Sequence, residues 1–125
     1  MQDFRKLNVW QKSHRLVLQV YEKTADFPKS ELFGVTAQTR RAAVSIAANI
    51  AEGCARSGDK EFARFLYISL GSASELEYFS ILIGDLGLLK RAEAAKIGAD
   101  AAEIKRMLSG LIASLPIQKD LTAES

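Results

Sequence analysis

A stretch of 87 residues without proline, from 29 to 115, constrains the fold of this chain more than any other feature. The two prolines of the chain, Pro28 and Pro116, stand at its ends. Because proline costs ~3 kcal/mol inside a helix, a proline-free stretch of this length favours long helices. Strong helix formers are frequent in it, and no segment shows a strand–turn–strand alternation. These features predict an all-α fold.

Apolar residues that recur every three to four positions divide the chain into four predicted helices. We expect them at about 8–25, 35–56, 60–86 and 91–114. The connections are short, so successive helices should be antiparallel neighbours. The prediction is a single domain over residues 1–125, folded as an up-and-down antiparallel four-helix bundle. Its polar tail, 118–125, is expected to be frayed.

The periodicity also predicts which residues face the bundle axis and which residues cap the helices. Thr36 is expected to cap the second helix, and Ser57 or Asp59 the third. The strongest core positions on the second and third helices are Ile46, Ile50, Leu66 and Leu76. The inner face of the fourth helix is predicted to consist of Ala95, Ala99, Ala102, Leu108, Leu111, Ile112 and Leu115.

Composition places the chain among ordinary globular proteins. Apolar residues make up 48% and charged residues 26%, which argues against extended disorder. No apolar run approaches the ~20 residues of a membrane span, and residues 1–8 contain no apolar signal core. Cys54 is the only cysteine, so no internal disulfide can form. We expect a cytoplasmic protein that does not enter a membrane.

The residues that usually carry catalysis or bind metals are scarce. His14 is the only histidine, and neither it nor Cys54 has an evident partner that would make it a general base or a nucleophile. No glutamate has a histidine three residues later, which excludes the diiron pattern of helical bundles. We therefore predict no catalytic residue, no metal site, no cofactor and no enzymatic activity.

A polar line on the second helix is the most distinctive pattern of side chains. Its residues are spaced by four, four and three, so they lie along one side of the helix. The third helix offers two polar residues, three apart, as partners. We predict a structural polar network that fixes helix register and contains Arg41, Ser45, Asn49, Glu52, Ser72 and Glu75. In the alternative interpretation, Arg41 faces outward and contacts phosphate.

Charge is unevenly distributed along the chain, although the net charge is only +2. Residues 1–56 carry nine Lys/Arg and five Asp/Glu, whereas residues 57–125 carry eight and ten. This asymmetry is compatible with a basic face that contacts nucleic acid. The candidate nucleic-acid-binding residues are Arg5, Lys6, Lys12, Arg15 and Arg40.

Three large apolar residues, Phe4, Leu7 and Trp10, fall in a short N-terminal stretch. One small bundle does not necessarily cover all of them, so they are candidates for contacts between subunits. The other interpretation is that they cap the core of their own bundle.

Three segments of the chain resemble a known family. They are F-R-K-L-N-V-W-Q-K-S at 4–13, E-L-F-G-V-T-A-Q-T-R-R-A-A-V-S-I-A-A-N-I-A-E-G at 31–53 and F-L-Y-I-S-L-G-S-A-S-E-L-E at 65–77, followed by L-G-L-L at 86–89. Over about residues 4–115 the sequence resembles the bacterial four helix bundle proteins called 23S ribosomal RNA intervening-sequence proteins. The resemblance implies a four-helix bundle that assembles as a ring-like homopentamer.

The resemblance also suggests two functional classes. Some members are encoded inside intervening sequences of 23S ribosomal RNA genes. Others are similar to accessory variability determinant proteins of diversity-generating retroelements, which are basic and bind nucleic acid with a reverse transcriptase. Because this chain is nearly neutral, we expect a non-catalytic homo-oligomeric scaffold or adaptor. The alternative is an accessory protein that binds RNA, DNA or a nucleic-acid-processing protein.

Overall fold

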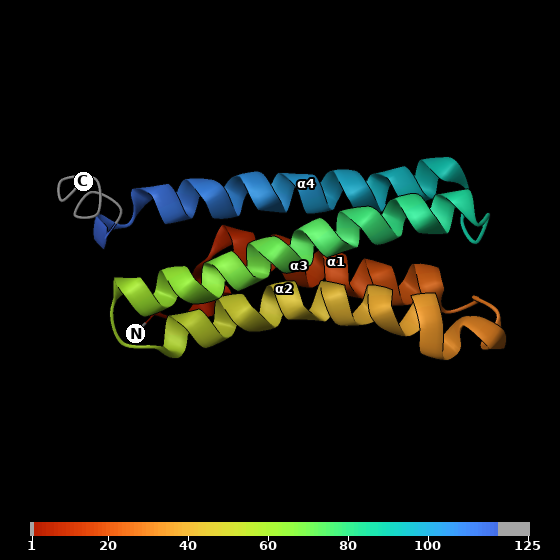
Figure 1. The fold of residues 1–125 in the computed structure, drawn as a ribbon. Coiled ribbons are helices and arrows are strands. Elements are labelled where there is room, and N and C mark those ends of the chain that lie inside the picture. Colours follow the sequence, from red (N-terminus) through yellow and green to blue (C-terminus); the bar gives the residue numbers. More distant parts are fainter. Residues whose placement is uncertain (1, 118–125) are drawn as a thin grey trace.

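The computed structural model describes residues 2–117, which contain four long helices lying side by side (Figure 1). These are α1 (Asn8–Thr24), α2 (Ala37–Ala55), α3 (Asp59–Asp85) and α4 (Arg91–Ser114). Each helix packs against the next, and α4 also contacts α1. The predicted all-α, up-and-down four-helix bundle is confirmed. The expected frayed tail lies outside the described residues.

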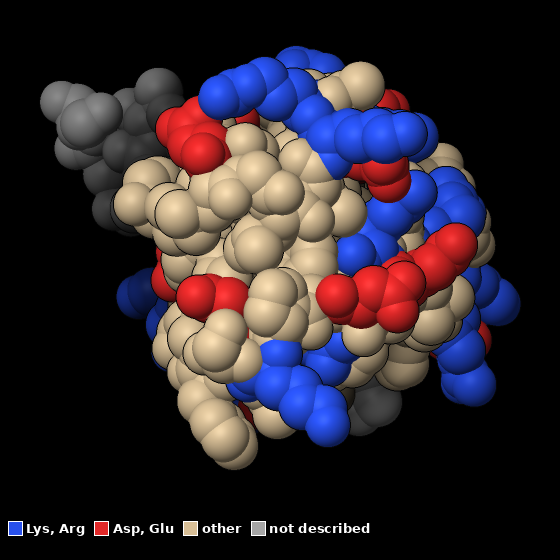
Figure 2. Space-filling model, turned by 90° about the vertical axis from the view of Figure 1, so that its right-hand side faces the viewer, with Lys and Arg blue, Asp and Glu red and all other residues tan. Residues whose placement is uncertain are grey.

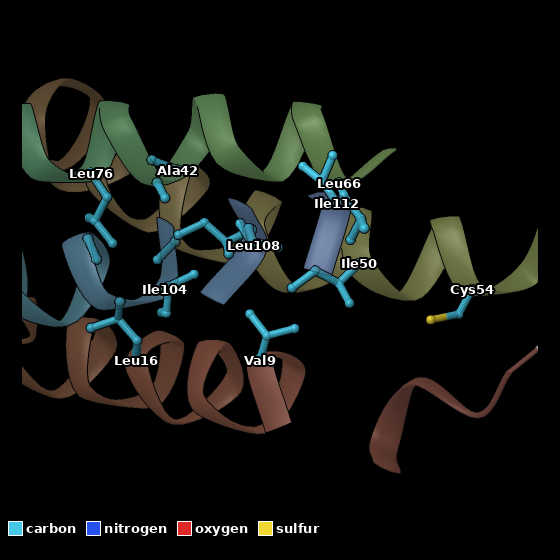
Figure 3. Close-up of a cluster of buried hydrophobic side chains, with 14 of the residues drawn as sticks. Val9, Leu16, Ala42, Ile50, Cys54, Leu66, Leu76, Ile104, Leu108 and Ile112 are labelled. Carbon is cyan, nitrogen blue, oxygen red and sulfur yellow. The ribbon is translucent and has the colours of Figure 1, made fainter. Parts of the chain in front are cut away.

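Side chains from all four helices meet in one continuous core (Figure 3). Ile50, Leu66 and Leu76 are fully buried there, together with Ile104 and Leu108 of α4. The core positions predicted on the second and third helices are confirmed. Each is at most 1% exposed; they are Ile46, Ile50, Leu66 and Leu76.

Several buried positions hold small hydroxyl side chains, and most of these hydroxyls donate to backbone carbonyls. Ser13 donates to Val9 O over 2.7 Å within α1. Ser69 of α3 donates to Ile46 O of α2 over 2.8 Å, so this bond joins two helices. A buried polar group costs little once it is hydrogen-bonded, and its small volume lets neighbouring backbones approach. These hydroxyls therefore fit a tightly packed core.

The chain enters α2 through two short turns rather than through a capped helix end. A 3-10 turn, η2 (Lys29–Glu31), leads into a π turn, η3 (Leu32–Thr36), which is kinked at Gly34. Thr36 has helical backbone angles and its side chain caps nothing, so the predicted cap is wrong. The reason is that η3 runs directly into α2, which leaves no free helix end at Thr36 to cap.

The turn between α2 and α3 also differs from the prediction. Gly58 occupies the N-cap position of α3 with a φ of 85°, and no side chain caps this end. Glycine adopts positive φ without the steric penalty of a Cβ atom, which explains its place there. The prediction of Ser57 or Asp59 as the cap is wrong. Asp59 is instead the first residue of α3, where its negative charge suits the helix dipole.

The first half of α4 is rotated relative to the predicted phase. Ala95 and Ala99 are exposed, so their predicted place on the inner face is wrong. The residues that α4 buries within its bounds are Ala94, Ile97, Ala101, Ile104, Leu108 and Ile112. The larger isoleucines enter the core because they bury more apolar surface than alanine does.

Candidate interaction surface on α2 and α3

A short chain of hydrogen bonds joins α2 to α3 at the edge of the bundle surface. The hydroxyls of Ser45 on α2 and Ser72 on α3 lie 2.8 Å apart. Asn49 Nδ2 donates to Ser45 Oγ over 3.0 Å and to Ser45 O over 2.9 Å, one turn earlier on α2. Ser72 is buried, whereas Ser45 and Asn49 are half-buried. The structure thus brings together three of the six residues predicted for the polar network.

The other three predicted members lie outside this chain of hydrogen bonds. Arg41 and Glu75 are both exposed and form no ion pair with each other, and the Arg41 guanidinium donates to the Gln38 side chain. Glu52 pairs with Arg56 one turn later, with Nη2 and Oε1 2.6 Å apart. The predicted place of Arg41 and Glu75 in the polar network is therefore wrong: both residues are exposed, where a charge needs no partner.

The outward face of α3 carries a row of large exposed side chains. Tyr67 is 53% exposed, Ile68 41%, Tyr78 57% and Ile81 62%. Gly71 lies between them, and a Cβ atom added there would meet nothing within 4 Å. We call this row the outer stripe and define it as Tyr67, Ile68, Gly71, Ser74, Tyr78 and Ile81. Large exposed apolar residues gathered on one face typically mark an interaction surface.

Sequence reasoning missed the outer stripe, although a signal for it was present. The residues that α3 turns toward the core repeat in steps of four and three along the sequence, and this rhythm predicts the buried face; they are Phe62, Leu66, Ser69, Ala73, Leu76, Ser80 and Ile83. A second set with the same rhythm runs through Tyr67, Gly71, Ser74, Tyr78 and Ile81. Two such sets on one helix cannot both face a single core, because they lie on opposite sides of the helix. The second set therefore indicates a surface outside the bundle.

The five candidate nucleic-acid-binding residues differ in their local surroundings. Arg5 pairs with Asp3 over 3.0 Å in the N-terminal segment. Lys12 of α1 reaches two carboxylates of α4, Asp100 at 3.6 Å and Glu103 at 3.1 Å. The charges of Arg5 and Lys12 are thus partly neutralised by acidic neighbours.

Arg40 also contacts its own bundle. Its Nε donates to Thr24 Oγ1 over 2.9 Å, and its guanidinium carbon lies 4.7 Å from the centre of the Tyr21 ring. Lys6 and Arg15 are exposed and form no ion pair within residues 2–117. Of the five candidates, these two are the most available to a phosphate.

The three N-terminal apolar candidates pack partly against their own bundle. Phe4 and Trp10 meet edge to face, with ring centres 4.9 Å apart, and both lie against the core together with Leu7. Gln2 N donates to Cys54 O over 3.2 Å, which ties this segment to the end of α2. Each of the three is half-buried, so part of the cluster is open to a further contact.

The two residues weighed as catalytic candidates have structural surroundings. The His14 ring stacks on Trp10, with ring centres 5.0 Å apart and planes inclined by 6°. Cys54 is buried, and burial raises the pKa of its thiol, which disfavours the reactive thiolate. Among the described residues, no group of three or more His, Cys, Asp or Glu is placed to hold a metal ion. Within the same residues, every helix is too short or too polar to cross a membrane.

A second group of exposed apolar side chains lies in the connections from α1 to α2 and from α3 to α4, at the end of the bundle that faces the viewer in Figure 2. Phe33 is 89% exposed there, and Leu32 and Leu86 are 45% and 55% exposed. In this view Lys and Arg side chains lie mainly along the top, right and bottom, with Asp and Glu side chains among them. Because both signs of charge are mixed, the visible face offers no continuous basic surface for nucleic acid.

Comparison with known proteins agrees with this fold. A family model described as "23S rRNA-intervening sequence protein" matches residues 5–110. Among solved structures, the chain is similar to a protein of unknown function from the S23 ribosomal protein family of Bacteroides thetaiotaomicron. The two share 27% sequence identity with a TM-score of 0.76, over 85% of this chain and 99% of that one. No curated protein matches the chain.

Proposed function

Because the chain belongs to the 23S rRNA-intervening sequence protein family, we propose that it is a non-catalytic, homo-oligomeric scaffold that binds partners as an assembly of copies. The observation that carries this proposal is the outer stripe of α3. Four of its large side chains are 41–62% exposed on the outward side of one helix. Large side chains with this much apolar surface are usually buried in the core of a bundle. An assembled protein would cover such a face. The family resemblance implies five copies in a ring.

A substitution at Gly71 tests whether the outer stripe is covered. In the isolated bundle, Gly71→Arg meets no neighbouring atom and replaces glycine by a better helix former, so the fold should persist. If another copy packs on the stripe, the long arginine side chain prevents its approach. We expect sedimentation equilibrium at micromolar concentration to show a heavy wild-type assembly and a Gly71→Arg protein at the mass of one chain.

Gly110→Arg is the matched control. Gly110 lies inside α4, and a Cβ atom there also meets nothing within 4 Å. Its substitution should leave the assembled mass unchanged. A wild-type protein that sediments as a monomer at micromolar concentration would contradict the proposed function.

Nucleic-acid binding is the second candidate function. It is favoured by two exposed cations, Lys6 and Arg15, that have no ion-pair partner within residues 2–117. A salt titration of binding to structured RNA and to duplex DNA tests it, since each phosphate contact contributes about −0.9 to the slope of log K against log salt on duplex DNA. Lys6→Ala and Arg15→Ala should each reduce the magnitude of that slope by about one. Lys60→Ala, at an exposed position of α3, is the control, and an absence of binding at low salt would exclude this candidate.

A further inference from the structure

The outer stripe of α3 has the geometry of a helix-packing surface. Five of its six residues, all except Ile68, follow one another at spacings of four, three, four and three positions. The residues that α3 buries inside the bundle show the same rhythm. This spacing places side chains along a nearly straight line on the helix, and it is the spacing through which near-parallel or antiparallel helices pack. A row of this kind fits the side of another helix better than a flat or irregular partner.

The outward face of α2 offers a complementary shape. Val44, Ala48 and Ala55 are exposed on it at spacings of four and seven, so they lie along one side of the helix. These residues are small, whereas the outer stripe presents Tyr67 and Tyr78. Large side chains on one helix pack well against small side chains on the other, because the backbones can then approach closely. The same chain thus provides both halves of a helix–helix contact.

The charges on the two faces are also complementary. Glu75 lies four residues after Gly71 and three before Tyr78, so it flanks the outer stripe. Arg41 lies three residues before Val44 and flanks the small face of α2. Both are exposed, and neither takes part in an ion pair among residues 2–117. Arg56, which follows α2 directly, and Arg64 of α3 are by contrast paired with Glu52 and Glu61.

We propose that the outer stripe of one copy packs on the outward face of α2 in the next copy, and that Glu75 pairs with Arg41 across this contact. Because the two faces differ, the contact is heterologous, and its repetition builds a closed ring when the rotation between copies allows closure. The proposal rests on the proposed function and identifies the faces through which the scaffold assembles.

Charge reversals test the pair between copies. Arg41→Glu and Glu75→Arg each bring like charges together at every contact, so each variant alone should raise the apparent dissociation constant of the assembly by at least about tenfold. When the two variants are mixed, the new carboxylate at position 41 of the first can meet the new guanidinium at position 75 of the second. The unchanged Arg41 of the second variant can likewise meet the unchanged Glu75 of the first. Alternation of the two variants restores at most four of the five contacts in a ring of five, because at least one contact then joins two copies of the same variant. We therefore expect the mixture to regain part of the assembled mass in sedimentation equilibrium, above that of either variant alone, whereas a pair within one chain would not be restored by mixing.

Arg106→Glu and Glu22→Arg serve as matched controls, since both residues are exposed and form no ion pair among residues 2–117. They should assemble like the wild type, separately and together. This contact would be overturned if the wild type assembles and both charge-reversed variants assemble equally well. It would also be overturned if the variants are weakened and mixing them restores no assembled mass. Either outcome would leave the proposed function in place. A wild-type monomer would overturn both.

Discussion

Ile50→Ala and Leu76→Ala should each lower the free energy of unfolding by ~2–5 kcal/mol. Both side chains are 0% exposed and lie in the core where the four helices meet (Figure 3). Truncation removes apolar surface from the core and leaves a cavity that the long, mutually packed helices can fill only partly. Urea unfolding followed by far-ultraviolet circular dichroism measures the loss. The protein concentration must be equal for all variants, since assembly also contributes to apparent stability.

Leu18→Ala is the matched control for these two variants. Leu18 lies on α1 and is 57% exposed, so the same kind of truncation removes little buried surface there. Its effect should stay within about 0.5 kcal/mol. A loss below ~1 kcal/mol for Ile50→Ala or Leu76→Ala would mean that these positions are less tightly packed than the structure shows.

The positions of the four helices could be predicted from the sequence because strong local signals agree with one another. Proline-free segments, stripes at three- and four-residue spacing and short connections all point to the same bundle. The predicted helices 60–86 and 91–114 compare with Asp59–Asp85 and Arg91–Ser114 in the structure. The start of α2 was less predictable. The kinked turn η3 leads directly into α2 at Ala37, so the helix begins without a side-chain cap that a sequence pattern could reveal.

The phase of α4 shows why alanine is a weak guide. Ala94 and Ala101 are buried, whereas Ala95 and Ala99 are exposed. An alanine side chain gains so little from burial that its presence does not distinguish the two faces. Ile97, together with Ile104 and Leu108, was the better indicator, because the phase of a helix follows the residues that gain most from leaving water.

The pairing of Arg41 with Glu75 shows a second limit of sequence patterns. Spacing on two helices predicts which residues share a side, and both residues do lie toward the outside of the bundle. It does not predict whether the charges meet within one chain or across two copies, because that depends on distances that periodicity does not contain. α2 and α3 pack so closely that the short side chains of Ser45 and Ser72 meet directly over 2.8 Å. At that separation there is no room between the helices for long charged side chains, which lie at the rim instead.

Gly53→Ala is expected to destabilise the protein by ~1–3 kcal/mol, although glycine to alanine usually stabilises a helix. Gly53 is buried near the end of α2, where α3 passes close to it. An added Cβ atom would lie 2.9 Å from Phe65 Cβ and 3.1 Å from Phe62 Cδ1. Phe65 Cβ cannot move without its backbone, so α2 and α3 would have to separate. The cost of that overpacking should exceed the ~1 kcal/mol that alanine gains in helix propensity.

Gly110→Ala makes the sign of this effect informative. Gly110 lies inside α4, and an added Cβ atom there meets nothing within 4 Å, so only the gain in helix propensity of up to ~1 kcal/mol remains. The two substitutions are chemically identical and should shift the urea midpoint in opposite directions. If Gly53→Ala were as stabilising as Gly110→Ala, close approach of α3 would not be the reason for glycine at position 53. A loss at 53 with a gain at 110 would show that the contact between α2 and α3, which also aligns Ser45 with Ser72, depends on a position without a side chain.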